Sequence, residues 1–155
     1  MADRMLKDYL DIAIEREEEA YQFYKALSLG ADNNQAKEAL DFLAGQELGH
    51  KKFLQEYKSG KLDKDTLRLT DVVDYKIAEY IEKPDIEKDM QGMDVYLVAA
   101  HRELNSYNFY KQLAAIHPEG SIKDMFLKMA NEELKHKEKV EYLYSNSAFA
   151  QTEGG

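Results

Sequence analysis

Apolar residues recur along the chain at helical spacing in four long stretches. The first stretch covers residues 3–29, and its apolar seam advances in steps of four and three: Leu6, Leu10, Ala13, Ala20, Tyr24 and Leu27. Such a seam is typical of the buried stripe of a helix in a bundle. Comparable seams run through residues 35–57, 89–116 and 122–144. We therefore expect four long helices and an all-α fold.

The connections between these helices predict how the helices are paired. The turns at 30–34 and 117–120 are short, so the helices on either side should be antiparallel neighbours. Asp32 with Gln35 resembles a capping box for the second helix. Residues 59–88 break the helical pattern, apart from a short helix expected within 71–81. This predicts an antiparallel four-helix bundle in which hairpins 3–58 and 89–144 are joined by one long crossover. Residues 1–155 would form a single domain with a frayed tail at 145–155.

The two hairpins are copies of one another. When residues 3–58 are aligned with 89–144, an offset of 86, sixteen of the 56 positions are identical. Composition alone would give only about four identities. The repeat predicts that neither hairpin carries a complete site and that two hairpins are needed to assemble one.

Charged residues interrupt the apolar seams at matching places in both hairpins: Glu17, Glu47 and His50 in the first, and Glu103, Glu133 and His136 in the second. A carboxylate on a buried seam is costly unless it is paired or bound to a metal ion. Four carboxylates and two divalent ions sum to zero charge. Four glutamates and two histidines, two of the glutamates standing in Glu-x-x-His motifs, match the inward-facing set of a di-iron or di-manganese bundle. We expect two iron ions, with manganese or a mixed pair as the alternative.

The predicted roles of the six ligands follow from this symmetry. Glu47 and Glu133 would bridge the two metal ions. Glu17 with His50, and Glu103 with His136, would be the terminal ligands. Tyr24 and Tyr110 lie two turns along the seam from the first glutamate of each hairpin. Their hydroxyls could donate hydrogen bonds to ligand carboxylates, although both could instead be ordinary core tyrosines.

Composition excludes several classes of protein. The 155 residues carry a net charge of −9, which argues against nucleic acid and anionic membranes as partners. No stretch has the length and apolarity of a membrane span, and the N-terminus lacks the apolar core of a signal peptide. The absence of cysteine excludes disulfides and a rubredoxin-type iron site on this chain. We expect a cytoplasmic protein.

These motifs resemble a known family. The strings Glu17-x3-Tyr21-x-Phe23-Tyr24 and Glu103-x3-Tyr107-x-Phe109-Tyr110, each followed by Glu-x-x-His, are similar to the ferritin-like superfamily and most similar to its rubrerythrin branch. The resemblance covers residues 3–144. It implies a non-haem di-iron centre that reacts with hydrogen peroxide or dioxygen. It also implies a peroxidase role in oxidative-stress defence, often as a homodimer.

Two departures from that resemblance affect the expected chemistry. Rubrerythrins carry a rubredoxin domain that supplies electrons, so this chain would need an external donor such as a rubredoxin-type protein. Rubrerythrins also carry an extra glutamate one turn beyond the ligand of the third helix, where this chain has Ser106 or Tyr107. The ligand set is therefore closer to the symmetric bacterioferritin type.

Three alternatives to a peroxidase remain open. The first is a ferroxidase that stores or handles iron. The second is a helical bundle in which the metal is purely structural. The third is a di-iron oxygenase that acts on an organic substrate.

Overall fold

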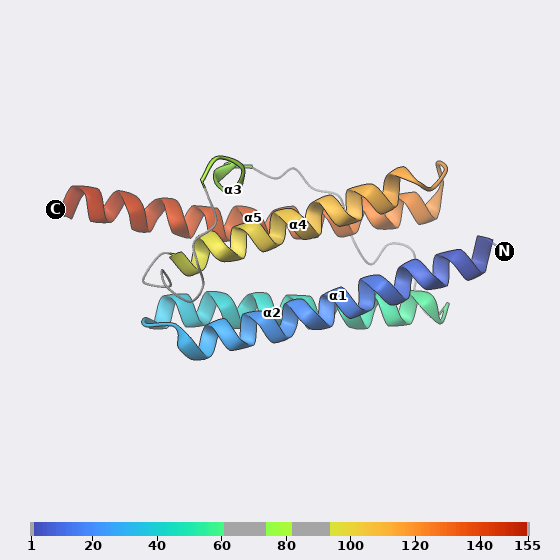
Figure 1. Ribbon diagram of the computed structural model, residues 1–155, viewed down its shortest axis with the longest axis horizontal. Helices are drawn as coiled ribbons and strands as arrows, with labels where there is room; N and C mark the ends of the chain where they lie inside the picture. Colours follow the sequence, from blue (N-terminus) through green and yellow to red (C-terminus); the bar gives the residue numbers. More distant parts are fainter. Residues whose placement is uncertain (1, 61–73, 82–93, 155) are drawn as a thin grey trace. The chain divides into compact units, whose positions relative to one another are not determined.

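The computed structural model describes residues 2–60, 74–81 and 94–154, and within them every regular element is a helix. The helices are α1 (Ala2–Gly30), α2 (Asn34–Lys58), α3 (Ile77–Tyr80), α4 (Asp94–Ala115) and α5 (Ser121–Gly154) (Figure 1). The predicted all-α class is therefore confirmed. The chain divides into two compact units, residues 1–66 and residues 67–155. The prediction of one domain built from both hairpins stays a prediction.

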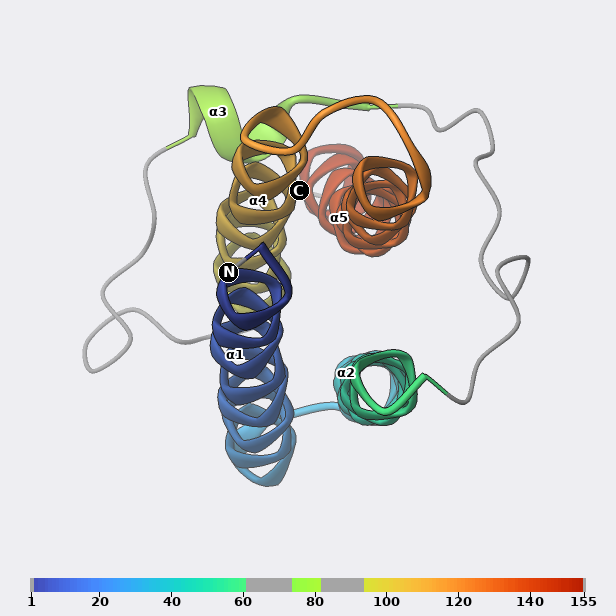
Figure 2. The same cartoon turned by 90° about the vertical axis from the view of Figure 1, so that its right-hand side faces the viewer.

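Unit 1 is a hairpin of α1 and α2. The two helices lie side by side and run in opposite directions (Figures 1 and 2). The Asn33 side chain begins α2 by accepting a hydrogen bond of 2.7 Å from the backbone N–H of Ala36. The capping-box pattern predicted Asp32 as the N-cap of α2, but the N-cap is Asn33. Asparagine fits because its short side chain accepts from the first turn of the helix. At the other end, Gly60 adopts a φ of 76°, a left-handed conformation that glycine takes without steric cost.

Unit 2 is a second hairpin, of α4 and α5, with α3 added to it. The helices α4 and α5 are also neighbours that run in opposite directions, and α3 lies against α4 (Figures 1 and 2). A short helix within 71–81 was predicted, and the four-residue α3 lies inside that range. Most of the predicted crossover 59–88, and the predicted start of the third long helix at residue 89, fall outside the described residues.

The seams predicted from the sequence are the buried faces of the long helices. On α1 the buried seam positions are Leu10, Ala13, Glu17, Ala20 and Tyr24. All five predicted seam positions of α2 are buried: Leu40, Leu43, Glu47, His50 and Leu54. The seams of α4 and α5 are likewise buried, except for Ser106 and Leu143, which are partly exposed. The spacing of apolar residues thus located the core correctly.

The end of α5 differs from the prediction. A frayed tail was expected from residue 145, but the helix continues to Gly154. No proline or glycine occurs in this stretch before Gly154, so nothing in the backbone stops the helix there. The small and polar side chains that suggested a tail weaken a helix only slightly.

Candidate metal centre

Unit 1 brings its three predicted ligands together. Glu17 lies on α1, while Glu47 and His50 lie one turn apart on α2. Glu47 and His50 share a face because residues three apart on a helix are neighbours. One ligand atom from each of the three residues lies within 4.8 Å of the other two. All three side chains are buried, with exposed fractions of 3%, 1% and 6% in chain order.

Unit 2 repeats this arrangement with the second set of ligands. Glu103 lies on α4, and Glu133 and His136 lie on α5. Their ligand atoms are again within 4.8 Å of one another, and all three residues are buried. Each hairpin by itself therefore carries one half-site of two carboxylates and one imidazole. We call residues 17, 47 and 50 the first half-site, and residues 103, 133 and 136 the second half-site.

The distance between histidine and glutamate is the same in both half-sites. His50 Nδ1 lies 3.7 Å from Glu17 Oε2, and His136 Nδ1 lies 3.6 Å from Glu103 Oε1. These separations are too long for hydrogen bonds. They do suit two ligands of one ion, because two donor atoms each about 2.1 Å from an ion can be at most about 4.2 Å apart. The imidazole and carboxylate of each half-site therefore have the spacing of a shared metal ion.

The charge of each half-site also fits a divalent ion. Two buried carboxylates carry a charge of −2, and burying them without compensation is costly. One divalent cation per half-site would cancel that charge. Nitrogen and carboxylate oxygen ligands without thiolates suit iron and manganese. The assignment of the six residues as ligands stays a prediction, but the donor set fits the metal ions that the sequence suggested.

The two tyrosines predicted to support the ligands, one on α1 and one on α4, are both buried. Tyr24 and Tyr110 each have an exposed fraction of 1%. Each packs edge-on against the phenylalanine before it, with ring centroids 5.7 Å apart for Tyr24 and Phe23 and 5.1 Å for Tyr110 and Phe109. This packing explains why the two tyrosine rings are buried. Their role as hydrogen-bond donors to the ligands stays a prediction.

Sequence reasoning missed an ion cluster around a buried lysine, directly beside the second half-site. Lys137 follows His136, has no exposed surface, and contacts three carboxylates. Its Nζ lies 2.6 Å from Asp74 Oδ1, 2.8 Å from Glu79 Oε1 and 3.1 Å from Glu141 Oε2. We call these four residues the Lys137 cluster. An oxygen from each carboxylate lies within 4.8 Å of the others, a spacing that would also suit a metal ion. Here the ammonium group of Lys137 lies between the carboxylates, where it provides the positive charge that a metal ion would otherwise supply.

The Lys137 cluster shifts the pKa values of its members. Burial alone would lower the pKa of Lys137, but its hydrogen bonds to Asp74, Glu79 and Glu141 outweigh burial and raise that pKa. Burial would raise the pKa of Asp74. The hydrogen bonds from Lys137 and from the backbone of Lys76, together with both lysine charges, lower it instead. Both shifts favour the charged forms of Lys137 and Asp74 at neutral pH.

A signal for this cluster was present in the sequence. The repeat places a lysine after each ligand histidine, Lys51 and Lys137, because 51 + 86 = 137. Conservation of a charged residue between two diverged copies could have marked the position. The repeat could not have revealed its partners Asp74 and Glu79, because both lie between the two hairpins, outside the repeated segments.

The family model of the rubrerythrins matches residues 8–144. Among curated proteins and among solved structures, no match was found. The fold and the buried half-sites fit the di-iron carboxylate class of proteins. The chain belongs to the rubrerythrin family, and the predicted fold class, an all-α ferritin-like four-helix bundle, is confirmed. Family membership and the buried carboxylates and histidines together fit a di-iron protein.

The predicted absence of a membrane span can be compared with the described helices. None of those helices combines the length and the apolarity that crossing a bilayer requires.

Proposed function

We propose that this chain is a di-iron peroxidase that reduces hydrogen peroxide with electrons from an external donor. The observation that carries the proposal is the repetition of one half-site in two hairpins, with matching distances of 3.7 and 3.6 Å between histidine and glutamate. Two hairpins packed about a pseudo-twofold axis would bring both half-sites together. Glu47 and Glu133 would then bridge the ions, and the other four ligands would each hold one ion.

The chemistry balances with two electrons. Hydrogen peroxide takes up two electrons and two protons and gives two molecules of water. A pair of ferrous ions, when bound, supplies those two electrons and is oxidised to two ferric ions. The electron donor must return two electrons, and a rubredoxin-type protein is the donor class that the family implies.

The residues of the chain have three tasks in this reaction. The ligand carboxylates hold the ions and balance their charge. Ala13 and Ala99, both with no exposed surface, leave space one turn before the first ligand of each hairpin. Tyr24 and Tyr110 would donate hydrogen bonds that fix the orientation of ligand carboxylates. The apolar seams on either side exclude bulk water from the ligands.

The second candidate is a ferroxidase that handles or stores iron. One observation favours it: both half-sites have the same three ligands, and α4 has Ser106 where a rubrerythrin-type extra glutamate would lie. This symmetric set suits dioxygen as the oxidant. Storage would require a large hollow assembly, whereas the peroxidase is proposed to be a homodimer in the cytoplasm. Size-exclusion chromatography separates these two assemblies.

The test is anaerobic loading with ferrous ion, followed by stopped-flow mixing with peroxide or dioxygen. We expect two irons per chain and faster oxidation by peroxide than by dioxygen. Glu47→Gln should lower the iron content and slow oxidation by about 100-fold or more, because it removes a bridging carboxylate. The matched control is Glu19→Gln, an exposed glutamate on α1, which should behave as wild type.

Three results would contradict the peroxidase. Faster oxidation by dioxygen would favour the ferroxidase. Oxidation no faster than that of ferrous ion in solution would favour a structural metal site. Equal iron content in wild type and Glu47→Gln would contradict the proposed metal centre itself.

A further inference from the structure

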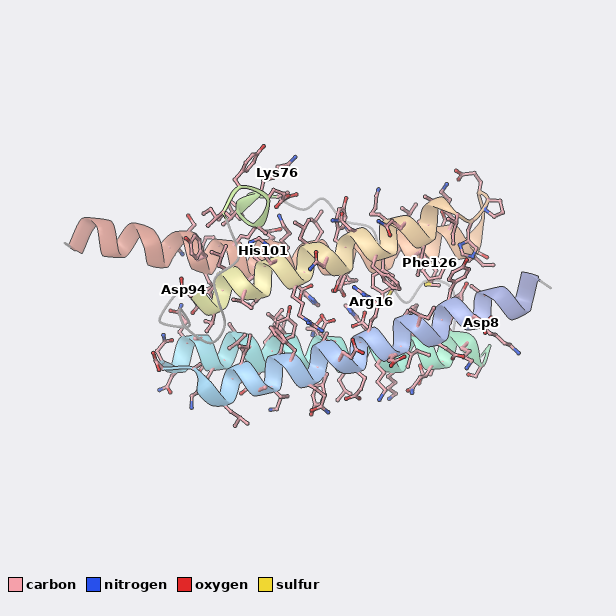
Figure 3. The ribbon with its side chains drawn as sticks, viewed as in Figure 1. Asp8, Arg16, Lys76, Asp94, His101 and Phe126 are labelled. Atoms are coloured by element: carbon pink, nitrogen blue, oxygen red, sulfur yellow. The ribbon has the colours of Figure 1, made fainter. Side chains whose placement is uncertain are left out.

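The two half-sites share their ligands but differ in what surrounds them. In unit 2, α3 is attached to both helices that carry ligands. Asp74, just before α3, and Glu79, within α3, both bind Lys137 of α5. The backbone carbonyl of Ile81, just after α3, lies 2.7 Å from Nε2 of His101 on α4. Figure 3 labels His101 and Lys76 where α3 lies against α4.

These attachments fall next to the ligands of the second half-site. Lys137 is the residue after His136, and His101 is two residues before Glu103. Glu141, one turn after Lys137, also accepts a hydrogen bond of 2.8 Å from the backbone N–H of Ala78 in α3. The Lys137 cluster therefore links α3 to the turn of α5 that carries His136, and the Ile81 carbonyl links it to the turn of α4 that carries Glu103.

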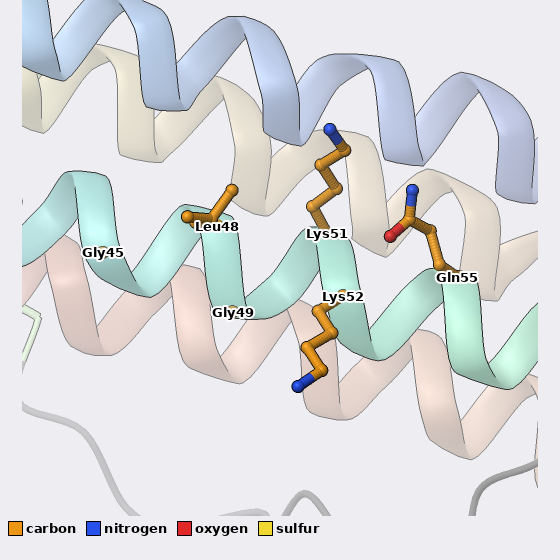
Figure 4. A pocket seen from close by; sticks show the side chains of 6 residues that line it. All are labelled: Gly45, Leu48, Gly49, Lys51, Lys52 and Gln55. Carbon is orange, nitrogen blue, oxygen red and sulfur yellow. The ribbon is translucent and has the colours of Figure 1, made fainter.

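Unit 1 has no third helix in its described residues 2–60. The lysine at the equivalent position, Lys51, instead binds Glu18 at 2.7 Å, and both side chains are partly exposed. The residue equivalent to Glu141 is Gln55, because 55 + 86 = 141. Lys51 and Gln55 line a groove of about 410 Å³ on α2, together with Leu48, Lys52 and two glycines (Figure 4). The groove therefore lies on α2 at the positions equivalent to those through which α5 binds α3.

The burial of the helix that carries the first ligand differs in the same way. In unit 2, Val98 on α4 has an exposed fraction of 1%. The equivalent residue of unit 1, Ile12 on α1, has an exposed fraction of 49%. The helix α4 is thus covered on a side where α1 faces solvent.

We propose that the Lys137 cluster and the contact between His101 and Ile81 hold the second half-site in its ligand geometry before metal binds, so that the first metal ion binds there. The first half-site, which α1 and α2 carry within the described residues 2–60, then receives the second ion. Fixing ligands before binding removes part of the ordering cost that a metal ion must otherwise overcome. Lys137 acts here as a positioning residue. This inference rests on the proposed function, since it requires that the half-sites bind metal.

The first test measures each half-site separately with Co²⁺ as the probe. His50→Ala leaves the second half-site intact, and His136→Ala leaves the first intact. We expect His50→Ala to bind one Co²⁺ about tenfold more tightly than His136→Ala, because residues that orient metal ligands contribute about 10- to 100-fold in affinity. The visible absorption of the bound ion reports binding without any need for activity.

A second pair of variants assigns that difference to the attachment of α3. The double change Asp74→Asn with Glu79→Gln removes both carboxylates on the α3 side and leaves the neutral pair of Lys137 and Glu141, so the core keeps its charge balance. In the His50→Ala background it should weaken Co²⁺ binding by about tenfold, and in the His136→Ala background it should change nothing. Glu18→Gln, which removes the equivalent partner of Lys51, is the matched control and should alter neither background.

Hydrogen exchange in the metal-free protein gives a readout that does not depend on metal. Backbone amides at 101–103 and 135–137 should exchange about tenfold more slowly than their equivalents at 15–17 and 49–51. The double change at Asp74 and Glu79 should remove this difference.

The outcomes separate the two proposals. Equal affinities in the two histidine variants, or equal weakening of both by the change at Asp74 and Glu79, would overturn the inference. Two ions bound by wild type in that case would leave the proposed function standing. Failure of wild type to bind any Co²⁺ or Fe²⁺ would overturn the proposed function, and the metal-binding order with it.

Discussion

The two hairpins began as one sequence, and they now place the same chemistry in different surroundings. In both hairpins a histidine and a glutamate lie about as far apart as two ligands of one ion, at 3.7 and 3.6 Å. In both, a lysine follows the histidine. Lys51 binds one partly exposed glutamate, whereas Lys137 is fully buried among three carboxylates. The comparison teaches that both hairpins share the ligand seam. A third helix lies against the hairpin of unit 2, whereas none occurs in the described residues 2–60 of unit 1.

The largest expected difference concerns the two equivalent lysines. Lys137→Met should lower the free energy of unfolding by about 3–5 kcal/mol, because it leaves the fully buried carboxylate of Glu141 without its counterion. Lys51→Met should lower it by less than about 1 kcal/mol, since an exposed ion pair contributes little. Urea unfolding followed by circular dichroism measures both. Equal losses would mean that the Lys137 cluster is no more important than a surface pair.

Core truncation at equivalent positions should give the next largest difference. Val98→Ala should cost about 2 kcal/mol, because it removes two methyl groups from a fully packed site. Ile12→Ala should cost less than about 0.5 kcal/mol, since Ile12 is about half exposed and its loss leaves no cavity. The same unfolding measurement applies. A comparable cost at Ile12 would show that α1 is covered in solution on the side that the structure leaves exposed.

A smaller and purely local effect is expected from acid. The pKa of Asp74 lies below its ordinary value of 3.8. Burial raises this pKa, but the hydrogen bond from Lys137 and the other favourable contacts lower it by more than burial raises it. A carboxyl with a lowered pKa stabilises the fold at pH above its unfolded value and loses this contribution as pH falls through the folded pKa. Attachment of α3 should therefore be constant between about pH 8 and pH 5 and weaken only below about pH 4.

The amide signal of Ala78 reports this attachment in NMR spectra, because that N–H donates to Glu141. Circular dichroism at the same pH distinguishes local release of α3 from global unfolding. Asp74→Asn should show a smaller acid-induced change at Ala78. Release of α3 already at pH 6 would contradict the role given to Asp74.

Much of the fold and of the candidate site was predictable from the sequence. The four long helices and their buried faces follow from apolar residues at spacings of three and four, which depend only on the geometry of one helix. The pairing of Glu47 with His50, and of Glu133 with His136, follows from the same geometry. The joining of Glu17 to that pair needed one further step, the short turn that returns α2 along α1.

The errors also have physical reasons. The cap of α2 is Asn33 because neighbouring polar residues compete for the same backbone N–H, and pattern alone does not rank them. The helix α5 extends to Gly154 because small polar residues lower helix stability only slightly and do not end a helix. His101 lies off the seam, and no sequence pattern indicates that its ring contacts the carbonyl of Ile81.

The sequence by itself determined the helices, their core seams and the composition of each half-site, because these depend on contacts between residues a few positions apart or across one short turn. Only the tertiary structure decided that Lys137 is buried among carboxylates. Asp74 lies 63 residues before Lys137, in the segment between the two hairpins, so no local pattern links them. Two copies of one hairpin therefore differ where the chain returns from a distance, and that difference distinguishes the second half-site from the first.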